Sequence, residues 1–126
     1  MLRDEDYLRS SRGLSLAHRN LQGLDLSPLG LYENLVSLDL SFTGITDPEV
    51  PALPPMAGLR WLELEANPLS NDALKVVQRL PALEELDLRQ TLVTEEGLAH
   101  LERHASLRHA LLPDGPLEFP DPGAGR

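Results

Sequence analysis

A 24-residue period constrains the fold of this chain more than any other feature of its sequence. The spacing L-x-x-L-x-L begins at Leu35, Leu59 and Leu83, and a fourth copy beginning at Leu107 has alanine in place of its second leucine. A weaker copy precedes them, with Ser11 in the place of the first leucine. One copy is too small to bury its own apolar face, so neighbouring copies must stack on one another. The period therefore predicts a single repeat domain with one continuous core.

The residues that follow each opening leucine alternate as in a short strand with one buried face. Leu38 and Leu40 are predicted to point inward, and Ser37, Asp39 and Ser41 outward. Equivalent residues of neighbouring parallel strands lie about 4.8 Å apart, so the outward residues should form rows. The central row is predicted to be Ser15, Asp39, Glu63, Asp87 and Leu111. The row on one side of it is Gly13, Ser37, Trp61, Glu85 and His109, and the row on the other side is Ala17, Ser41, Glu65, Arg89 and Pro113. Beyond this last row lie His18, Phe42, Ala66 and Gln90.

The segments that return from one strand to the next are predicted to be helical in two copies. Ser70 and Thr94 are suited to cap helices, and residues 71–80 have their apolar side chains at helical spacing. In the copy that begins at Leu35, Thr46 and Glu49 form a capping-box signal. Three prolines at positions 51, 54 and 55 exclude a continuous helix there, so a short helical turn and then extended chain are expected.

The full spacing, L-x-x-L-x-L-x-x-(N/T)-x-(L/I/V), resembles the leucine-rich repeat family over about residues 11–117. It reads LVSLDLSFTGI, LRWLELEANPL and LEELDLRQTLV in successive copies. The resemblance implies a right-handed α/β solenoid, with a short parallel sheet on its concave face and helical or irregular segments on its convex face. In the family an asparagine side chain bonds backbone groups of the turn; Asn67 occupies that position, and Thr43 and Thr91 hold it in the neighbouring copies.

The two ends of the chain are predicted to differ from the repeats. The repeat domain is expected over residues 1–117, as about four to five coils with residues 1–13 as an N-terminal cap in which Tyr7 and Leu8 cover the first coil. Ala110, Pro113 and Pro116 predict a short last strand that closes the stack. Residues 118–126 form a Pro- and Gly-rich tail, from which Phe119 is expected to pack back as a lid.

Composition excludes several classes of function. The net charge of −9 and the pI near 4.8 disfavour nucleic acids and anionic membranes as ligands, and they favour a basic partner unless the charge serves solubility alone. The chain has no cysteine, hence no disulfide, thiolate metal site or cysteine nucleophile. Its first residues do not form a secretory signal, so a cytoplasmic protein is expected. A single lysine among many arginines, with abundant Leu, Ala, Pro and Gly, suggests a bacterial source.

Trp61 is the sharpest functional candidate, because the period places this single tryptophan on the outward face, where exposed aromatics are common anchors of interfaces. The competing interpretation is that it covers the stem of Arg60. We predict a non-enzymatic module that binds a basic protein or peptide through its acidic concave sheet; the alternative is a structural or assembly subunit that acts through its end coils or convex face. The predicted binding residues are Ser37, Asp39, Phe42, Trp61, Glu63, Glu65, Glu85, Asp87 and Arg89.

Signals for catalysis, cofactors or metals are weak. His100, Glu102 and His104 form H-x-E-x-H, but no third ligand is evident, so an ordinary helix face is the preferred interpretation. The strand carboxylates lack the wrapping loop that calcium sites use. No glycine-rich phosphate loop and no nucleophile elbow occurs in the sequence. No cofactor, no metal and no catalytic residue is therefore predicted.

Overall fold

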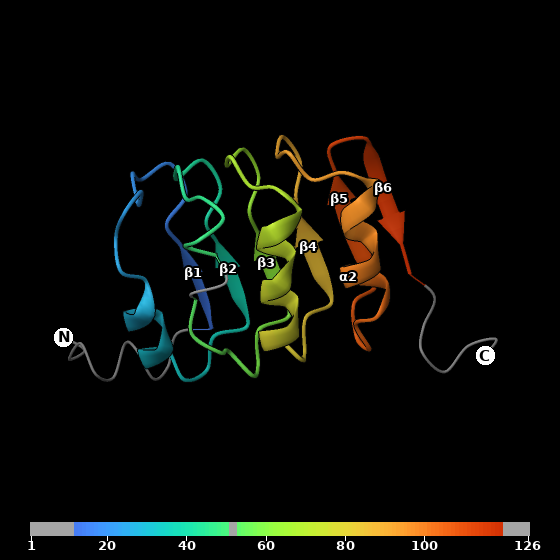
Figure 1. Cartoon of the computed structure of the whole chain (residues 1–126). Helices are drawn as coiled ribbons and strands as arrows, with labels where there is room; N and C mark the ends of the chain where they lie inside the picture. Colours follow the sequence, from blue (N-terminus) through green and yellow to red (C-terminus); the bar gives the residue numbers. More distant parts are fainter. Residues whose placement is uncertain (1–11, 51–52, 120–126) are drawn as a thin grey trace.

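The computed structural model describes residues 12–50 and 53–119, which form one six-stranded sheet (Figure 1). The strands follow one another in chain order across the sheet. The first four pairings are parallel, and the last strand is antiparallel to its neighbour. The strands are β1 (Gly13–Ser15), β2 (Ser37–Asp39), β3 (Trp61–Glu63), β4 (Glu85–Asp87), β5 (His109–Leu112) and β6 (Gly115–Glu118).

The register of the parallel strands confirms the rows predicted from the period. Leu38 pairs with Leu62 and Leu62 with Leu86, so each residue lies beside the residue 24 positions away. The two outward positions of each strand keep the same register. One row therefore runs Ser37, Trp61, Glu85, His109, and the central row runs Asp39, Glu63, Asp87, Leu111.

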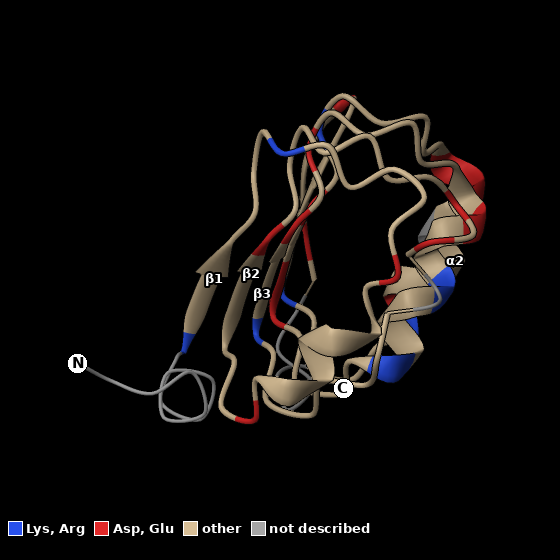
Figure 2. Ribbon diagram, turned by 90° about the vertical axis from the view of Figure 1, so that its left-hand side faces the viewer, with Lys and Arg blue, Asp and Glu red and all other residues tan. Residues whose placement is uncertain are grey.

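The second layer consists of short helices that lie across from the sheet; Figure 2 shows β1 to β3 and α2 on opposite sides of the molecule. These elements are η1 (Ser27–Leu31), η2 (Asn71–Arg79), η3 (Glu95–Gly97) and α2 (Leu98–Glu102). The leucines that point inward from the strands fill the space between the layers: Leu38, Leu62 and Leu86 are all at most 2% exposed. On the helical side, Val77 and Leu101 are buried against them.

The helix predicted over residues 71–80 is present, but its type differs. Residues 71–79 form a 3-10 helix, and the hydroxyl of Ser70 accepts a hydrogen bond from the Asp72 N–H at 3.4 Å, which confirms Ser70 as the cap. A 3-10 helix rises about 2.0 Å per residue and an α-helix 1.5 Å. Nine residues therefore cover about 18 Å of the return path instead of about 13.5 Å.

Asn67 has the role that the resemblance implied. Its side chain is 2% exposed, and its Oδ1 accepts hydrogen bonds from the backbone N–H groups of Thr43 at 3.0 Å and Gly44 at 2.9 Å. Its Nδ2 donates to the carbonyl oxygens of Leu40 at 2.9 Å and Leu64 at 3.1 Å. One side chain therefore joins two successive turns.

The threonines at the equivalent positions reach less far. The Thr43 hydroxyl donates to the Leu40 carbonyl at 2.7 Å, and the Thr91 hydroxyl to the Leu88 carbonyl at 2.6 Å. Each of these bonds stays within its own turn. The prediction that threonine is a shorter substitute for asparagine is confirmed, with the difference that Asn67 also bonds the preceding copy.

Two local predictions need correction or completion. Ser41 was predicted to point outward, and its hydroxyl and N–H both donate to the outward Asp39 carboxylate, the N–H at 2.9 Å, but the residue is only 6% exposed, so it lies covered on that side. In the capping-box signal, the Glu49 carboxylate accepts hydrogen bonds from both the N–H and the hydroxyl of Thr46. Half of the capping box is thus present, while residues 51–52 lie outside the described part.

Strand β6 was not predicted from the sequence. Residues 115–118 fold back along β5, and the Phe119 N–H donates to the Arg108 carbonyl at 2.8 Å. Phe119 packs against the core, as the lid prediction required. Pro116 leaves a gap in the row of donors of β6, because proline has no N–H, which makes this edge a poor template for a further strand. Of the cap predicted at residues 1–13 and the tail predicted at residues 118–126, residues 1–11 and 120–126 lie outside the described part, while Gly13 belongs to β1 and Glu118 to β6.

No helix among the described residues is both long enough and apolar enough to span a bilayer.

Candidate interaction surface

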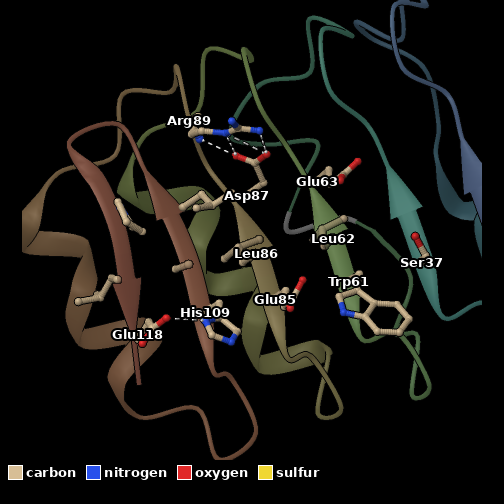
Figure 3. A pocket seen from close by; sticks show the side chains of 14 residues that line it. Ser37, Trp61, Leu62, Glu63, Glu85, Leu86, Asp87, Arg89, His109 and Glu118 are labelled. Carbon is tan, nitrogen blue, oxygen red and sulfur yellow. Dashed lines mark hydrogen bonds and ion pairs between the residues drawn. The ribbon is translucent and has the colours of Figure 1, made fainter. Parts of the chain in front are cut away.

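The outward face of the sheet carries a shallow groove of about 640 Å³, which extends from Ser37 on β2 across β3 to β6 (Figure 3). The two rows of outward residues line it and continue onto β6, where Glu118 pairs with His109 and Pro116 with Leu111. Of the predicted binding residues, six line the groove: Ser37, Trp61, Glu63, Glu85, Asp87 and Arg89. Asp39 and Glu65 lie beside it without lining it.

Trp61 is exposed on this face and also contacts Arg60. The prediction of an exposed aromatic and the competing interpretation, contact with Arg60, therefore each describe part of its surroundings. The residue is 37% exposed. The guanidinium carbon of Arg60 lies 4.9 Å from the centre of its ring, at a distance that suits a cation–π contact. Arg60 also forms an ion pair with Glu84. Arg60 therefore covers part of the indole and holds it in place, while the remaining surface faces the groove.

One of the three carboxylates in the central row, Asp87, is paired with an arginine. Asp87 is 7% exposed, and the Arg89 guanidinium donates to both its carboxylate oxygens, at 3.0 Å and 2.7 Å. A second contact joins Arg89 to Glu65 at 3.5 Å. Asp87 and Arg89 therefore form a bidentate pair. The pair neutralises one of the three carboxylates that the sequence placed in the central row.

Asp39 and Glu63 form the second feature of the row, a pair of interacting carboxyl groups. Partial burial, together with a hydrogen bond shared with Asp39 and the negative charges of Asp39, Asp87 and Glu65, raises the pKa of Glu63 to about 7. Burial also opposes ionisation of Asp39, but hydrogen bonds from the backbone and hydroxyl of Ser41 and from Glu63 outweigh it, so the pKa of Asp39 is lowered. The physical result is one proton held between two neighbouring acids, mainly on Glu63.

We expect Glu63→Gln to stabilise the protein above neutral pH. The raised pKa means that folded Glu63 keeps its proton where the unfolded chain releases it, so this group destabilises the fold as the pH rises from about 4.5 through about 7. Glutamine stays neutral and can donate to Asp39. After allowance for the solvent around this exposed side chain, the expected gain is about 1 kcal/mol at pH 8 and near zero at pH 4.

Urea unfolding at both pH values measures this difference. Glu102→Gln is the matched control, because Glu102 is an exposed carboxylate on α2, across from the sheet. It should leave the pH profile of the wild type unchanged. An equal gain at the two pH values for Glu63→Gln would contradict the shared proton.

Phe42 does not join the groove. It lies in the turn after β2 with a positive φ of 58°, and its ring stacks on His18 with 4.7 Å between ring centres. Ala66 and Gln90 occupy equivalent turns with φ of 58° and 56°. The left-handed backbone at this position directs the side chain away from the strand rows. Phe42 is 42% exposed, so it remains a surface residue separate from the other candidates.

The groove also contains residues that the sequence analysis left out of its predicted site. His109 and Leu111 belonged to the predicted rows but were not chosen, and Pro116 and Glu118 were assigned to no strand. His109 Nδ1 lies 3.5 Å from a carboxylate oxygen of Glu118. The period gave the rows as far as β5. The antiparallel return of β6 has no counterpart in the repeats, so nothing in the period pointed to its two residues.

In the H-x-E-x-H segment, His104 has a structural role. Nδ1 of His104 accepts hydrogen bonds from the N–H groups of Ser106 and Leu107, both at 3.2 Å, so the ring proton must lie on Nε2, which donates to the Leu80 carbonyl at 2.8 Å. His104 thereby joins the end of α2 to the end of η2. Within the described part of the chain, no three His, Asp or Glu side chains gather as a metal site would require.

Comparison with known proteins gives little further information. No family model and no curated protein matches the chain. A solved structure of an internalin (inlF) from Listeria monocytogenes str. 4b F2365 is similar over 96% of this chain and 47% of its own, with 16% sequence identity and a TM-score of 0.36. The present chain thus spans about half the length of that protein. The chemistry of the groove residues is therefore the basis for a functional proposal.

Proposed function

We propose that this chain is a non-enzymatic interaction module, built as a right-handed leucine-rich repeat solenoid, which binds a basic protein or peptide on the open face of its sheet. The observation that carries the proposal is Trp61, exposed beside Glu63 and Glu85 in one groove. An aromatic ring held by a neighbouring side chain can bury apolar area at little entropic cost. The nearby carboxylates favour a cationic partner and speed its approach.

The charged residues of the groove favour a positively charged partner. Asp87 and Arg89 neutralise each other, whereas Glu63 and Glu85 are exposed. Glu85 forms no ion pair within the part of the chain that the structure describes. A lysine or arginine placed between Glu63 and Glu85 would also favour ionisation of Glu63. Binding should therefore strengthen as the pH rises through about 7 and weaken as salt is added.

Affinity capture from the native host lysate, read by mass spectrometry, tests the proposal. The bait is the wild type or the double variant Trp61→Ala, Glu63→Lys. Glu102→Lys on α2 reproduces the charge change away from the sheet and serves as the control. We expect the partner to be lost from the double variant and retained by the control. Its purified form should then bind the double variant at least tenfold more weakly in calorimetry, because both an aromatic anchor and a carboxylate are removed.

A partner retained equally by all three baits would contradict the proposal and direct attention to the end strands or the helical side. Circular dichroism and thermal unfolding of each bait show that the fold is intact.

A further inference from the structure

The central row of the groove changes its chemistry halfway across the sheet. On β3 the row contains Glu63, and on β4 it contains Asp87, whose carboxylate forms an ion pair with Arg89. On β5 and β6 the same row carries Leu111 and Pro116, which are paired with each other. Leu111 is half-buried and Pro116 is exposed. The central row is therefore acidic at one end and apolar at the other, while the flanking row has Trp61 at the first end and the His109–Glu118 pair at the second.

The separation of the two ends follows from the strand spacing. The exposed acids Glu63 and Glu85 lie on β3 and β4, and the apolar pair lies on β5 and β6. The midpoints of the two pairs are two strand spacings, about 9.6 Å, apart across the sheet and about one residue, 3.3 Å, apart along it, which gives a separation of about 10 Å. A ligand with one cationic and one apolar group must place them at this separation to use both ends.

A polyproline II segment has the matching repeat. It rises about 3.1 Å per residue with three residues per turn, so side chains three positions apart lie on the same side at about 9.3 Å. In a β-strand the side chains alternate, and those on one side lie about 6.7 Å or 13.4 Å apart. Three-residue spacing therefore fits the groove, while two-residue spacing is too short and four-residue spacing is too long.

We propose that the groove binds a linear segment in the polyproline II conformation, lying across β3 to β6, with a lysine or arginine three residues from an aliphatic side chain. This inference rests on the proposed function and names the partner of the same groove. The cation lies between Glu63 and Glu85 beside the Trp61 ring. The aliphatic side chain lies on Leu111 and Pro116, with the His109–Glu118 pair at its flank.

Synthetic peptides with capped ends test this geometry directly. Each contains one arginine and one leucine in a proline, glycine and serine background, with the leucine two, three or four positions from the arginine; further peptides lack one of the two residues. Trp61 is the only tryptophan, so its fluorescence reports binding. We expect the peptide with three-residue spacing to bind at least fivefold more tightly than the other two spacings and than either single-residue peptide.

A pair of protein variants assigns the apolar end. Leu111→Ser should remove the preference for the leucine-containing peptide, and Pro116→Ala should weaken it. Leu92→Ser is the matched control, because Leu92 is 66% exposed and does not line the groove. It should bind as the wild type does. Thermal unfolding confirms that each variant is folded.

The outcomes separate this inference from the proposed function. If all arginine peptides bind alike, and Leu111→Ser has no effect although Trp61→Ala and Glu85→Lys still weaken binding in calorimetry, the spacing rule is wrong and the basic-partner function stands. If no peptide binding depends on Trp61 or Glu85, the polyproline II proposal is wrong, and the capture experiment with the double variant decides the basic-partner function separately. If the free protein is a dimer that Trp61→Ala converts to a monomer in sedimentation, a second copy occupies the groove and the peptide proposal is overturned.

Discussion

Replacing Asn67 with alanine should lower the free energy of unfolding by about 4 kcal/mol, the largest effect that we expect of any single side chain outside the leucine core. The replacement leaves the buried N–H group of Thr43 and the half-buried N–H group of Gly44 without their acceptor. It also removes the donor to the carbonyls of Leu40 and Leu64. Each buried group left without a partner costs about 1–3 kcal/mol, so the Thr43 N–H group and the Leu64 carbonyl together account for the estimate.

Urea unfolding gives the free energy, and a fall of the melting temperature by roughly 10–15 °C should accompany it. Asn20→Ala is the control, because Asn20 is exposed and its side chain accepts a hydrogen bond only within its own turn, from the Gln22 N–H at 3.1 Å. It should cost no more than about 1 kcal/mol. A loss as small as that for Asn67→Ala would mean that water replaces the side chain, and that the bond between successive turns contributes little.

Gly97→Ala should cost about 2 kcal/mol, although alanine is the better helix former. A Cβ at position 97 would lie 2.4 Å from Oδ1 of Asn71 and 2.6 Å from a methyl carbon of Leu74. Leu74 is 1% exposed, so it has little room to move. Asn71 holds the next copy through Thr94, whose N–H donates to its Oδ1 at 3.0 Å and whose hydroxyl accepts from its Nδ2 at 2.8 Å.

The expected cost of Gly97→Ala therefore combines a steric clash with the loss of a contact between helices. Gly58→Ala is the matched control, because a Cβ there would meet only the Leu35 carbonyl oxygen at 3.6 Å, an ordinary contact. It should change the free energy of unfolding by less than about 0.5 kcal/mol. Equal stabilities for the two variants would show that Asn71 and Leu74 move aside at no cost.

The two stability predictions and the proposed binding site depend on the same register. The pairing that stacks Leu38, Leu62 and Leu86 inside the molecule also aligns Trp61 with Glu85 on the outer face. A binding surface made of rows needs a constant spacing between strands. The hydrogen bonds of Asn67 and Asn71 between copies help to maintain that spacing. Destabilising either contact should therefore disturb the groove even though neither residue lines it.

The sequence predicted the sheet well because its information is periodic. Residues 24 positions apart have the same environment, so the leucines that must be buried also determine which residues lie beside one another. The exposure of Trp61 and the pairing of Asp39 with Glu63 could be predicted from their places in the period, and the family resemblance implied the role of Asn67 in its turn. None of these depends on the exact path of the return segments.

The tertiary structure decided what the period does not encode. Asp87 and Glu63 occupy the same place in successive copies, yet Asp87 is buried and paired, because Arg89 lies two residues later, whereas Glu65 holds that place after Glu63. Partial burial and the neighbouring carboxylates raise the pKa of Glu63 to about 7. The apolar end of the groove likewise exists only because β6 folds back and places Pro116 against Leu111. The spacing of leucines determines which residues are neighbours, but the charge and accessibility of each site depend on every group around it.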